Sequence, residues 1–141
     1  MLSSDTAARP KSIAYQQNVP LDPKAVSDLF RAASLNGPLD DLERMRTMLV
    51  NSQLVITAWD GTELVGLART LTDFAFNGFI ADLAVHPSYQ RRGIGKELIR
   101  LTLATSASVK YVVHSAATSD GYYEHVGFDP AEGCWVFMRR R

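Results

Sequence analysis

Three features of the sequence predict a single α/β domain built on a mixed β-sheet. Two segments with helical spacing of apolar residues come first, and a β-hairpin pattern follows them. The second half then alternates strand and helix patterns, which indicates a parallel crossover because parallel strands are joined through a helix. The hairpin adds antiparallel strands, so the sheet is mixed. The predicted order of elements is β-α-α-β-β-β-α-β-α-β.

Composition limits what this chain can be. It has 141 residues, 46% hydrophobic and 21% charged, as in ordinary globular proteins. We expect a flexible tail over residues 1–11 and one domain over residues 12–141. Fifteen basic residues balance fifteen acidic ones, so no overall field favours nucleic acid or an anionic membrane. No apolar run approaches the ~20 residues that cross a bilayer, and no signal-peptide pattern opens the chain, so we expect a cytoplasmic protein.

The first half carries clear start and turn signals. Residues 12–19 can form an edge strand. Asp22 is placed to cap a helix that has proline at its first position, and apolar residues then recur at three- and four-residue spacing. Residues 40–52 predict a second helix. Two β-rich runs then flank Asp60-Gly61, which predicts a hairpin with a type I′ turn.

The second half predicts five more elements. They are a strand over residues 77–87, a helix over 93–108, a strand over 110–115, a short helix over 119–128 and a final strand over Cys134–Arg140. Pro87 ends the first of these strands, and Gly127 stops the short helix. Cys134 is expected to be a buried, unreactive thiol. As the single cysteine, it excludes an intrachain disulfide and a multi-cysteine metal site.

The segment Gln90–Lys96, Gln-Arg-Arg-Gly-Ile-Gly-Lys, is the most informative motif. It fails the P-loop pattern, because glutamate follows Gly-Lys, and the dinucleotide pattern, because leucine holds the third glycine position. Gly93 and Gly95 leave the backbone accessible at the start of a helix, where N–H groups lack internal partners and the potential is positive. These features suit a phosphate or pyrophosphate. A glycine-rich turn with solvated arginines accounts for the same residues.

Two motifs together resemble the GNAT superfamily of N-acetyltransferases. The segment Leu83–Ile99 is similar to the acyl-CoA-binding segment of that family, whose pattern is Gln/Arg-x-x-Gly-x-Gly/Ala after a strand. Gln90, Gly93 and Gly95 match it. The segment Tyr122–Phe128 is similar to a second signature, Phe-Tyr-Glu-Lys-x-Gly-Phe. One motif is weak evidence, whereas the ordered pair is specific.

The resemblance implies a fold and a cofactor. The fold is a central mixed, mostly antiparallel sheet with splayed parallel strands 4 and 5, flanked by about four helices. The acyl donor is acetyl-CoA, with its pyrophosphate on the N–H groups of the helix start and its pantetheine arm beside the preceding strand, as an added strand would lie. The residues expected to bind it are Leu83, Ala84, Val85, Gln90, Arg91, Arg92, Gly93, Ile94, Gly95 and Lys96.

The resemblance also implies a reaction, the attack of a primary amine of a small molecule on the thioester. Tyr123 takes the position of the tyrosine that assists the leaving thiolate. Because a phenol of pKa ~10 is a weaker acid than a thiol of ~8.5, we expect it to hydrogen-bond the sulfur. Asp82, which strand alternation points away from Leu83, is expected either to hold the substrate ammonium or a relay water, or to be satisfied by backbone amides. His114 is the second candidate base. Ala116 stands where many relatives have an asparagine that contacts the cofactor arm.

Two other functions stay open on this sequence. One is a non-catalytic acyl-CoA-binding or regulatory module, and the other is an acetyltransferase acting on protein lysines or N-termini. No two of the three histidines have metal-ligand spacing, so we expect no metal. Relatives often dimerise through sheet edges or C-terminal strands, and the apolar final strand predicts a homodimer. The expected partner is otherwise a small-molecule amine, with neither nucleic acid nor membrane.

Overall fold

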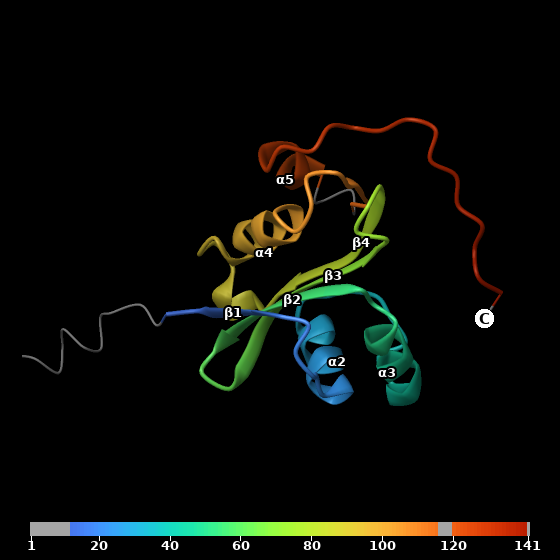
Figure 1. Ribbon diagram of the computed structural model, residues 1–141. Helices are drawn as coiled ribbons and strands as arrows, with labels where there is room; N and C mark the ends of the chain where they lie inside the picture. Colours follow the sequence, from blue (N-terminus) through green and yellow to red (C-terminus); the bar gives the residue numbers. More distant parts are fainter. Residues whose placement is uncertain (1–11, 116–119, 141) are drawn as a thin grey trace, which may run out of the picture.

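The computed structural model describes residues 12–115 and 120–140, and it contains a β-sheet with helices on both faces (Figure 1). The elements are β1 Ala14–Gln17, α2 Pro23–Ala32, α3 Leu42–Val50, β2 Leu54–Asp60, β3 Glu63–Thr72, β4 Asn77–Val85, the 3₁₀ helix η1 Pro87–Tyr89, α4 Ile94–Leu103, β5 Lys110–Val113 and α5 Asp120–His125. Helices α2 and α3 lie below the sheet in Figure 1, and α4 and α5 lie above it.

The sheet has the mixed topology that the sequence predicts. Its strand order is β1-β2-β3-β4-β5, so each strand lies beside the next one in the chain. The first four pair antiparallel, whereas β4 and β5 are parallel. The crossover between these two runs through α4, as a parallel connection requires. The prediction of a mostly antiparallel sheet with parallel strands 4 and 5 and about four helices is therefore confirmed, since the described residues form four α-helices.

Aspartates start both helices on the lower face. Asp22 Oδ1 accepts a hydrogen bond of 3.0 Å from the backbone N–H of Lys24, and Asp41 Oδ1 accepts one of 3.1 Å from that of Arg44. Each satisfies an N–H group that has no partner within its helix. These helices and the sheet share a core made of Val26, Leu29, Phe30, Met45, Val55, Leu67 and Ala84.

A second core lies under α4 on the other face of the sheet. It consists of Leu54, Ile56, Ala58, Val65, Ala68, Ile94 and Leu98. Strands β2 and β3 supply both cores because successive side chains of a strand point to opposite faces. At the end of β4, Leu83 and Val85 pack against this second core, while Ala84 belongs to the first. Both faces of β4 are therefore held just before the Gln90–Lys96 segment.

The β2–β3 hairpin turns one residue later than predicted. Asp60 pairs with Glu63, so Gly61 and Thr62 are the central residues of the turn. Of these two, only Gly61 has a positive φ, +59°. That matches a type II′ turn, in which the first central residue alone needs positive φ, and the predicted type I′ turn is wrong. Asp60 stays in β2, where its carboxylate accepts a hydrogen bond from the hydroxyl of Tyr89.

The predicted final strand, Cys134–Arg140, is not formed. Residues 128–140 have no regular secondary structure, and Figure 1 shows them as the long red segment that leaves α5 and runs outside the sheet. Cys134 is exposed, so the prediction of a buried thiol is also wrong. A strand needs a neighbour to pair its backbone groups, and this segment pairs with none of the five strands.

Three further expectations concern a membrane-spanning helix, the N-terminal tail and Ala116. Within the described residues, no helix combines the length and the apolar character that crossing a bilayer requires. The predicted tail, residues 1–11, and the position of Ala116 lie outside the described residues.

Candidate active site

Strand β4 extends five residues beyond its last pairing with β5, because β5 ends at Val113. Residues Asn77–Ile80 pair with Lys110–Val113, while β4 continues to Val85. Beyond that point, the edge of β4 that faces β5 has no strand partner among the described residues. A strand edge of this kind presents free backbone groups to which an extended ligand can hydrogen-bond.

A β-bulge coincides with the point of separation. Asp82 lies opposite Arg69 and Ile80 lies opposite Thr70, which leaves Ala81 as an extra residue in β4. A bulge bends its strand and increases the local twist. The bulge therefore lies next to the last paired residue of β4, Ile80, where β5 ends.

Helix α4 starts without the cap that the other long helices have. Its N-cap residue, Gly93, has no side chain and makes no side-chain cap hydrogen bond, whereas α2 and α3 are capped by aspartates. The first helical bond runs from the N–H of Glu97 to the carbonyl of Gly93, at 3.0 Å. The N–H groups of Ile94, Gly95 and Lys96 therefore precede the helical ladder and add positive potential at the helix start.

The loop before α4 is held in a strained conformation. Arg91 has φ +65° and Gly93 has φ +81°, and the left-handed region favours glycine. The side-chain amide of Gln90 donates a 3.0 Å hydrogen bond to the carbonyl of Val85, which ties the loop to the end of β4. A Cβ atom on Gly93 would meet no heavy atom within 4 Å. The space in front of the helix start is therefore open.

Tyr89 anchors this loop to the β2–β3 hairpin. Its hydroxyl hydrogen-bonds Asp60, and this bond is the main cause that raises the pKa of Tyr89 above its usual value. The guanidinium of Arg92 lies 5.2 Å from the centroid of the Tyr89 ring. Arg91 and Lys96 are exposed on the same loop and first helical turn. Three cationic residues, Arg91, Arg92 and Lys96, thus belong to the loop and first turn at the uncapped helix start.

Tyr122 of α5 lies beside Gly95 in the first turn of α4. A Cβ atom on Gly95 would lie 2.9 Å from the Tyr122 hydroxyl and 3.6 Å from a methyl group of Val85. The hydroxyl is buried and has no hydrogen-bond partner among the described residues. Burial raises the pKa of Tyr122, so the phenol is neutral at pH 7. A buried hydroxyl without a partner, beside an uncapped helix start, suits a polar group of a ligand. Tyr122 belongs to the second sequence motif, Tyr122–Phe128, and the role expected for it from the sequence is aromatic packing rather than ligand binding.

Tyr123 is the residue that the sequence predicts to assist the leaving group. Its ring packs edge-to-face on Phe128, at 5.7 Å between centroids, and on Tyr122, at 5.4 Å. Burial, and to a smaller extent the neighbouring Tyr122, raises the pKa of Tyr123. The phenol therefore keeps its proton at neutral pH and is a hydrogen-bond donor.

Asp82 is engaged in an ion pair on the opposite face from Leu83, as strand alternation predicts. Its Oδ2 lies 2.6 Å from Arg69 Nε, and the two side chains are only 12% and 11% exposed. Arg69 also donates to the hydroxyl of Ser52 at 3.2 Å. An incoming ammonium group would compete with a guanidinium for this carboxylate. The role of Arg69 could not be predicted from the sequence, because its pairing with Asp82 depends on the register of β3 on β4.

An open cavity of about 720 Å³ lies on the sheet where β4 and β5 still pair. Apolar side chains of Leu71, Phe79 and Val112 line it, together with Lys110 and His114. His114 follows β5 directly, is exposed, and stacks edge-to-face on Phe79 with 5.3 Å between centroids. The second candidate base is therefore at the rim of this cavity.

The structure brings most of the predicted binding residues together. The ends of β4, the Gln90 loop and the first turn of α4 are contiguous, and Tyr122 joins them. The side chain of Ala84 points into the lower core, so only its backbone lies on the free edge. Within residues 12–115 and 120–140, no group of three or more potential metal ligands occurs.

Comparison with known proteins identifies the family. Residues 28–134 match the family model described as "Acetyltransferase (GNAT) domain". The chain therefore belongs to the GNAT acetyltransferase family, as the two sequence motifs predict. Relatives include "Uncharacterized N-acetyltransferase ycf52" of Pyropia yezoensis, 36% identical over 70% of this chain and 63% of that protein. Another is "Probable acetyltransferase TAP2" of Glycine max, 34% identical over 57% of this chain and 37% of its own length. The chain thus spans less than two thirds of these relatives.

Solved structures share the fold over nearly the whole chain. An acetyltransferase of the GNAT family from Streptococcus pneumoniae TIGR4 is 26% identical, with a TM-score of 0.72, over 92% of this chain and 100% of that one. The aminoglycoside N-acetyltransferase AAC(6')-Iy, solved in complex with CoA, is 16% identical, with a TM-score of 0.71, over 95% and 99% of the two chains.

Proposed function

We propose that this chain is an acetyl-CoA-dependent N-acetyltransferase that transfers an acetyl group to a primary amine of a small molecule. The observation that carries the proposal is the uncapped start of α4, set beside the unpaired edge of β4. These two features offer N–H groups for a diphosphate and backbone groups for an extended arm within one contiguous site. Family membership and a structural neighbour solved with CoA support the same cofactor.

The residues present fit acetyl-CoA. Backbone N–H groups of Ile94, Gly95 and Lys96 would hold its pyrophosphate, and the buried hydroxyl of Tyr122 has no hydrogen-bond partner among residues 12–115 and 120–140. The cosubstrate would supply the thioester that carries the acetyl group. Arg91 and the other two cations of the loop would add charge that favours an anion.

Proton handling falls to the chain's own side chains. An alkyl amine of pKa ~10.4 costs about 4–5 kcal/mol to deprotonate at pH 7, at ~1.36 kcal/mol per unit, so an acceptor for that proton is useful. Asp82 in its ion pair and His114 at the cavity rim are the two groups that could accept it through water. Tyr123 holds its phenol proton and would hydrogen-bond the leaving sulfur without releasing it.

The cavity supports a small acceptor. Its volume of about 720 Å³ lies within the ~300–1,000 Å³ range of small-molecule sites, and it adjoins the end of the β4–β5 pairing. An amine bound there would approach the site from the face opposite to α4, because Phe79 and Val112 line the cavity and the α4 core lies on the other face.

Calorimetry and a thiol-release assay test the proposal together. Wild-type protein is titrated with acetyl-CoA, and free thiol is then measured with phenylethylamine, spermidine and a lysine-containing peptide as acceptors. We expect binding, and thiol release with one of the two small amines. Binding without thiol release would make the chain an acyl-CoA-binding module, and release with the peptide alone would make it a protein acetyltransferase.

A matched pair of variants at Gly93 tests the anion site itself. Asparagine and aspartate both tolerate positive φ better than other residues and have nearly the same shape, so Gly93→Asn and Gly93→Asp differ mainly in charge. A helix start favours an anion by up to ~2 kcal/mol, and the carboxylate of the aspartate would compete with the diphosphate for this position. We therefore expect the aspartate to weaken acetyl-CoA binding by at least about tenfold more than the asparagine. Equal affinities for the two variants would remove the helix start from the binding site.

A further inference from the structure

The loop before α4 carries two arginines whose surroundings differ. Arg91 and Arg92 are both exposed, and they directly precede Gly93, the N-cap residue of α4. Neither forms an ion pair within residues 12–115 and 120–140. The guanidinium of Arg92, however, lies over the ring of Tyr89, 5.2 Å from its centroid, where an aromatic face attracts a cation. The ring therefore restrains the charge that stands next to the helix start.

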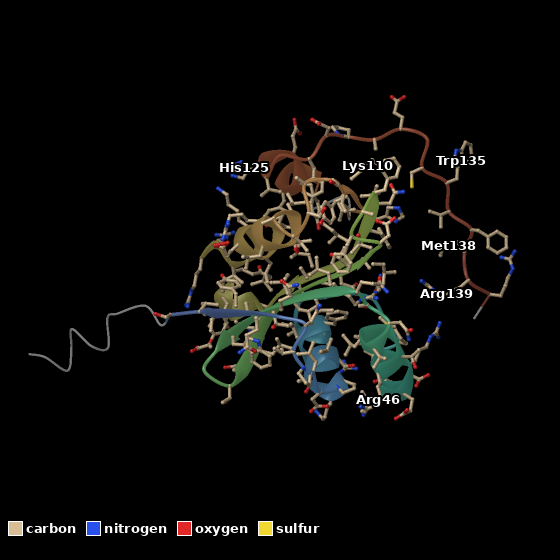
Figure 2. All side chains as sticks on the ribbon, in the orientation of Figure 1. Arg46, Lys110, His125, Trp135, Met138 and Arg139 are labelled. Atoms are coloured by element: carbon tan, nitrogen blue, oxygen red, sulfur yellow. The ribbon has the colours of Figure 1, made fainter. Side chains whose placement is uncertain are left out.

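Tyr89 is itself held by the β2–β3 hairpin. Its hydroxyl donates a hydrogen bond to the carboxylate of Asp60, the last residue of β2. This bond joins the hairpin to the loop that precedes α4, at one end of the sheet (Figure 2). A hydrogen bond to an ionised acceptor is stronger than one to a neutral acceptor. Asp60 therefore fixes the tyrosine whose ring carries Arg92.

The backbone around Tyr89 is fixed by neighbouring contacts. The ring of His86 lies edge-to-face on the Tyr89 ring, with 6.1 Å between centroids. Nδ1 of His86 accepts a 3.1 Å hydrogen bond from the backbone N–H of Ser88, and the N–H of His86 donates one of 2.8 Å to the carbonyl of Val65 in β3. Residues of β2, β3 and the end of β4 thus hold Tyr89 in one place.

The charge of Asp60 does not explain its position beside an anion site. Besides the hydrogen bond to Asp60 and burial, the charges of Asp60 and Glu63 raise the pKa of Tyr89, whereas Arg92 lowers it. Two carboxylates at this end of the sheet repel a diphosphate, so their charge opposes binding. What Asp60 offers the site is an acceptor for the Tyr89 hydroxyl.

We propose that Tyr89 is a positioning residue for the cofactor: held by Asp60, it keeps the guanidinium of Arg92 next to the uncapped start of α4, where this charge meets the diphosphate of acetyl-CoA. The inference rests on the proposed function, because it assigns Arg92 to that cofactor. An arginine loses side-chain freedom when it binds a phosphate, and one that is already restrained loses less. Arg91 supplies charge without this restraint.

A double-mutant cycle on acetyl-CoA affinity tests the coupling. Tyr89→Phe keeps the ring and removes the hydrogen bond to Asp60. Calorimetry should show a loss of affinity of about three- to tenfold, the scale of ordering one long side chain. In an Arg92→Gln background the same change should cost less than about twofold, because the residue through which it acts is gone. In an Arg91→Gln background the full loss should persist. Equal losses in all three backgrounds would make Tyr89 a structural residue only and would overturn the proposal.

Acetyl-dephospho-CoA, which keeps the diphosphate and lacks the 3′-phosphate, identifies the group that Arg92 meets. Tyr89→Phe should weaken binding of this donor and of acetyl-CoA by the same factor. A loss with acetyl-CoA alone would place Arg92 at the 3′-phosphate and refute the assignment to the diphosphate. A wild-type protein that binds neither donor would count against the proposed function, whereas tight wild-type binding with equal losses in the three backgrounds would refute the positioning role alone.

Nuclear magnetic resonance of the unliganded protein tests the restraint without the cofactor. In the wild type, the order parameter of the Arg92 Nε–H group should exceed that of Arg91, because only Arg92 lies on a fixed ring. Tyr89→Phe should lower it in part, and Tyr89→Leu, which removes the ring, should lower it to the Arg91 value. An Arg92 side chain as mobile as Arg91 in the wild type would refute the restraint.

Discussion

Arg69 Nε and Asp82 Oδ2 lie 2.6 Å apart across β3 and β4, directly beside Ala81, the extra residue of the β4 bulge. The ion pair and the bulge therefore belong to one local structure. An acid on β4 that the sequence offers as a candidate proton acceptor is also a support for the site's geometry.

The two roles of Asp82 can be separated by neutralising both partners. Asp82→Asn alone leaves a buried guanidinium without its counter-charge and should lower the free energy of unfolding by about 3 kcal/mol. The double variant Asp82→Asn with Arg69→Gln has no unpaired charge and should recover most of that loss in urea denaturation. If Asp82 accepts the amine proton, turnover stays low in the stable double variant and its pH dependence changes. If the double variant turned over substrate at the wild-type rate, the role of Asp82 would be structural only.

The effect of Gly95→Ala on stability should change sign when Tyr122 is replaced by phenylalanine. Gly95→Ala places a Cβ atom 2.9 Å from the Tyr122 hydroxyl and should destabilise the protein by about 1–3 kcal/mol through overpacking. In a Tyr122→Phe background that oxygen is gone, and the next ring atom is 3.7 Å away. There the same change should stabilise α4 by up to ~1 kcal/mol, the helix preference of alanine over glycine. Thermal or urea denaturation of the four proteins measures this; additive effects would contradict the contact.

The two neighbouring tyrosines should affect different steps. Tyr122→Phe removes a buried hydroxyl that has no partner in the part of the chain that the structure describes, so the unliganded protein should gain stability, by an amount within the ~1–3 kcal/mol cost of such a group. Acetyl-CoA binding should weaken in calorimetry. Tyr123→Phe should lower kcat and leave acetyl-CoA affinity nearly unchanged. If the two variants had the same profile, the division of roles between these residues would be wrong.

Alkaline pH should destabilise the fold through the same pair. The pKa values of Tyr122 and Tyr123 are raised in the folded protein, mainly by burial. Both phenols therefore favour the neutral folded form, and their contribution to stability is complete below the unfolded value of ~10 and is lost as pH rises through the folded values. Urea midpoints measured from pH 9 to pH 11.5 should fall more steeply for wild type than for the double variant Tyr122→Phe, Tyr123→Phe. Parallel curves would show that other groups control the alkaline limb.

Local sequence patterns predicted much of this fold. Asp22 caps its helix, β4 ends just before Pro87, and the Gln90–Lys96 segment opens a helix, because capping, proline and glycine effects act within a few residues. The turn at Gly61 was misplaced by one residue, since strand pairing on either side sets the turn register.

The sequence by itself determined the family, the mixed sheet and the segment that carries the candidate site. The tertiary structure alone decided which groups meet there. The register of β3 on β4 pairs Asp82 with Arg69, the packing of α5 on α4 brings Tyr122 to Gly95, and β5 is left with an open apolar edge. Each of these contacts joins residues far apart in the chain, and their geometry follows from bulges and packing that no local pattern of residues encodes.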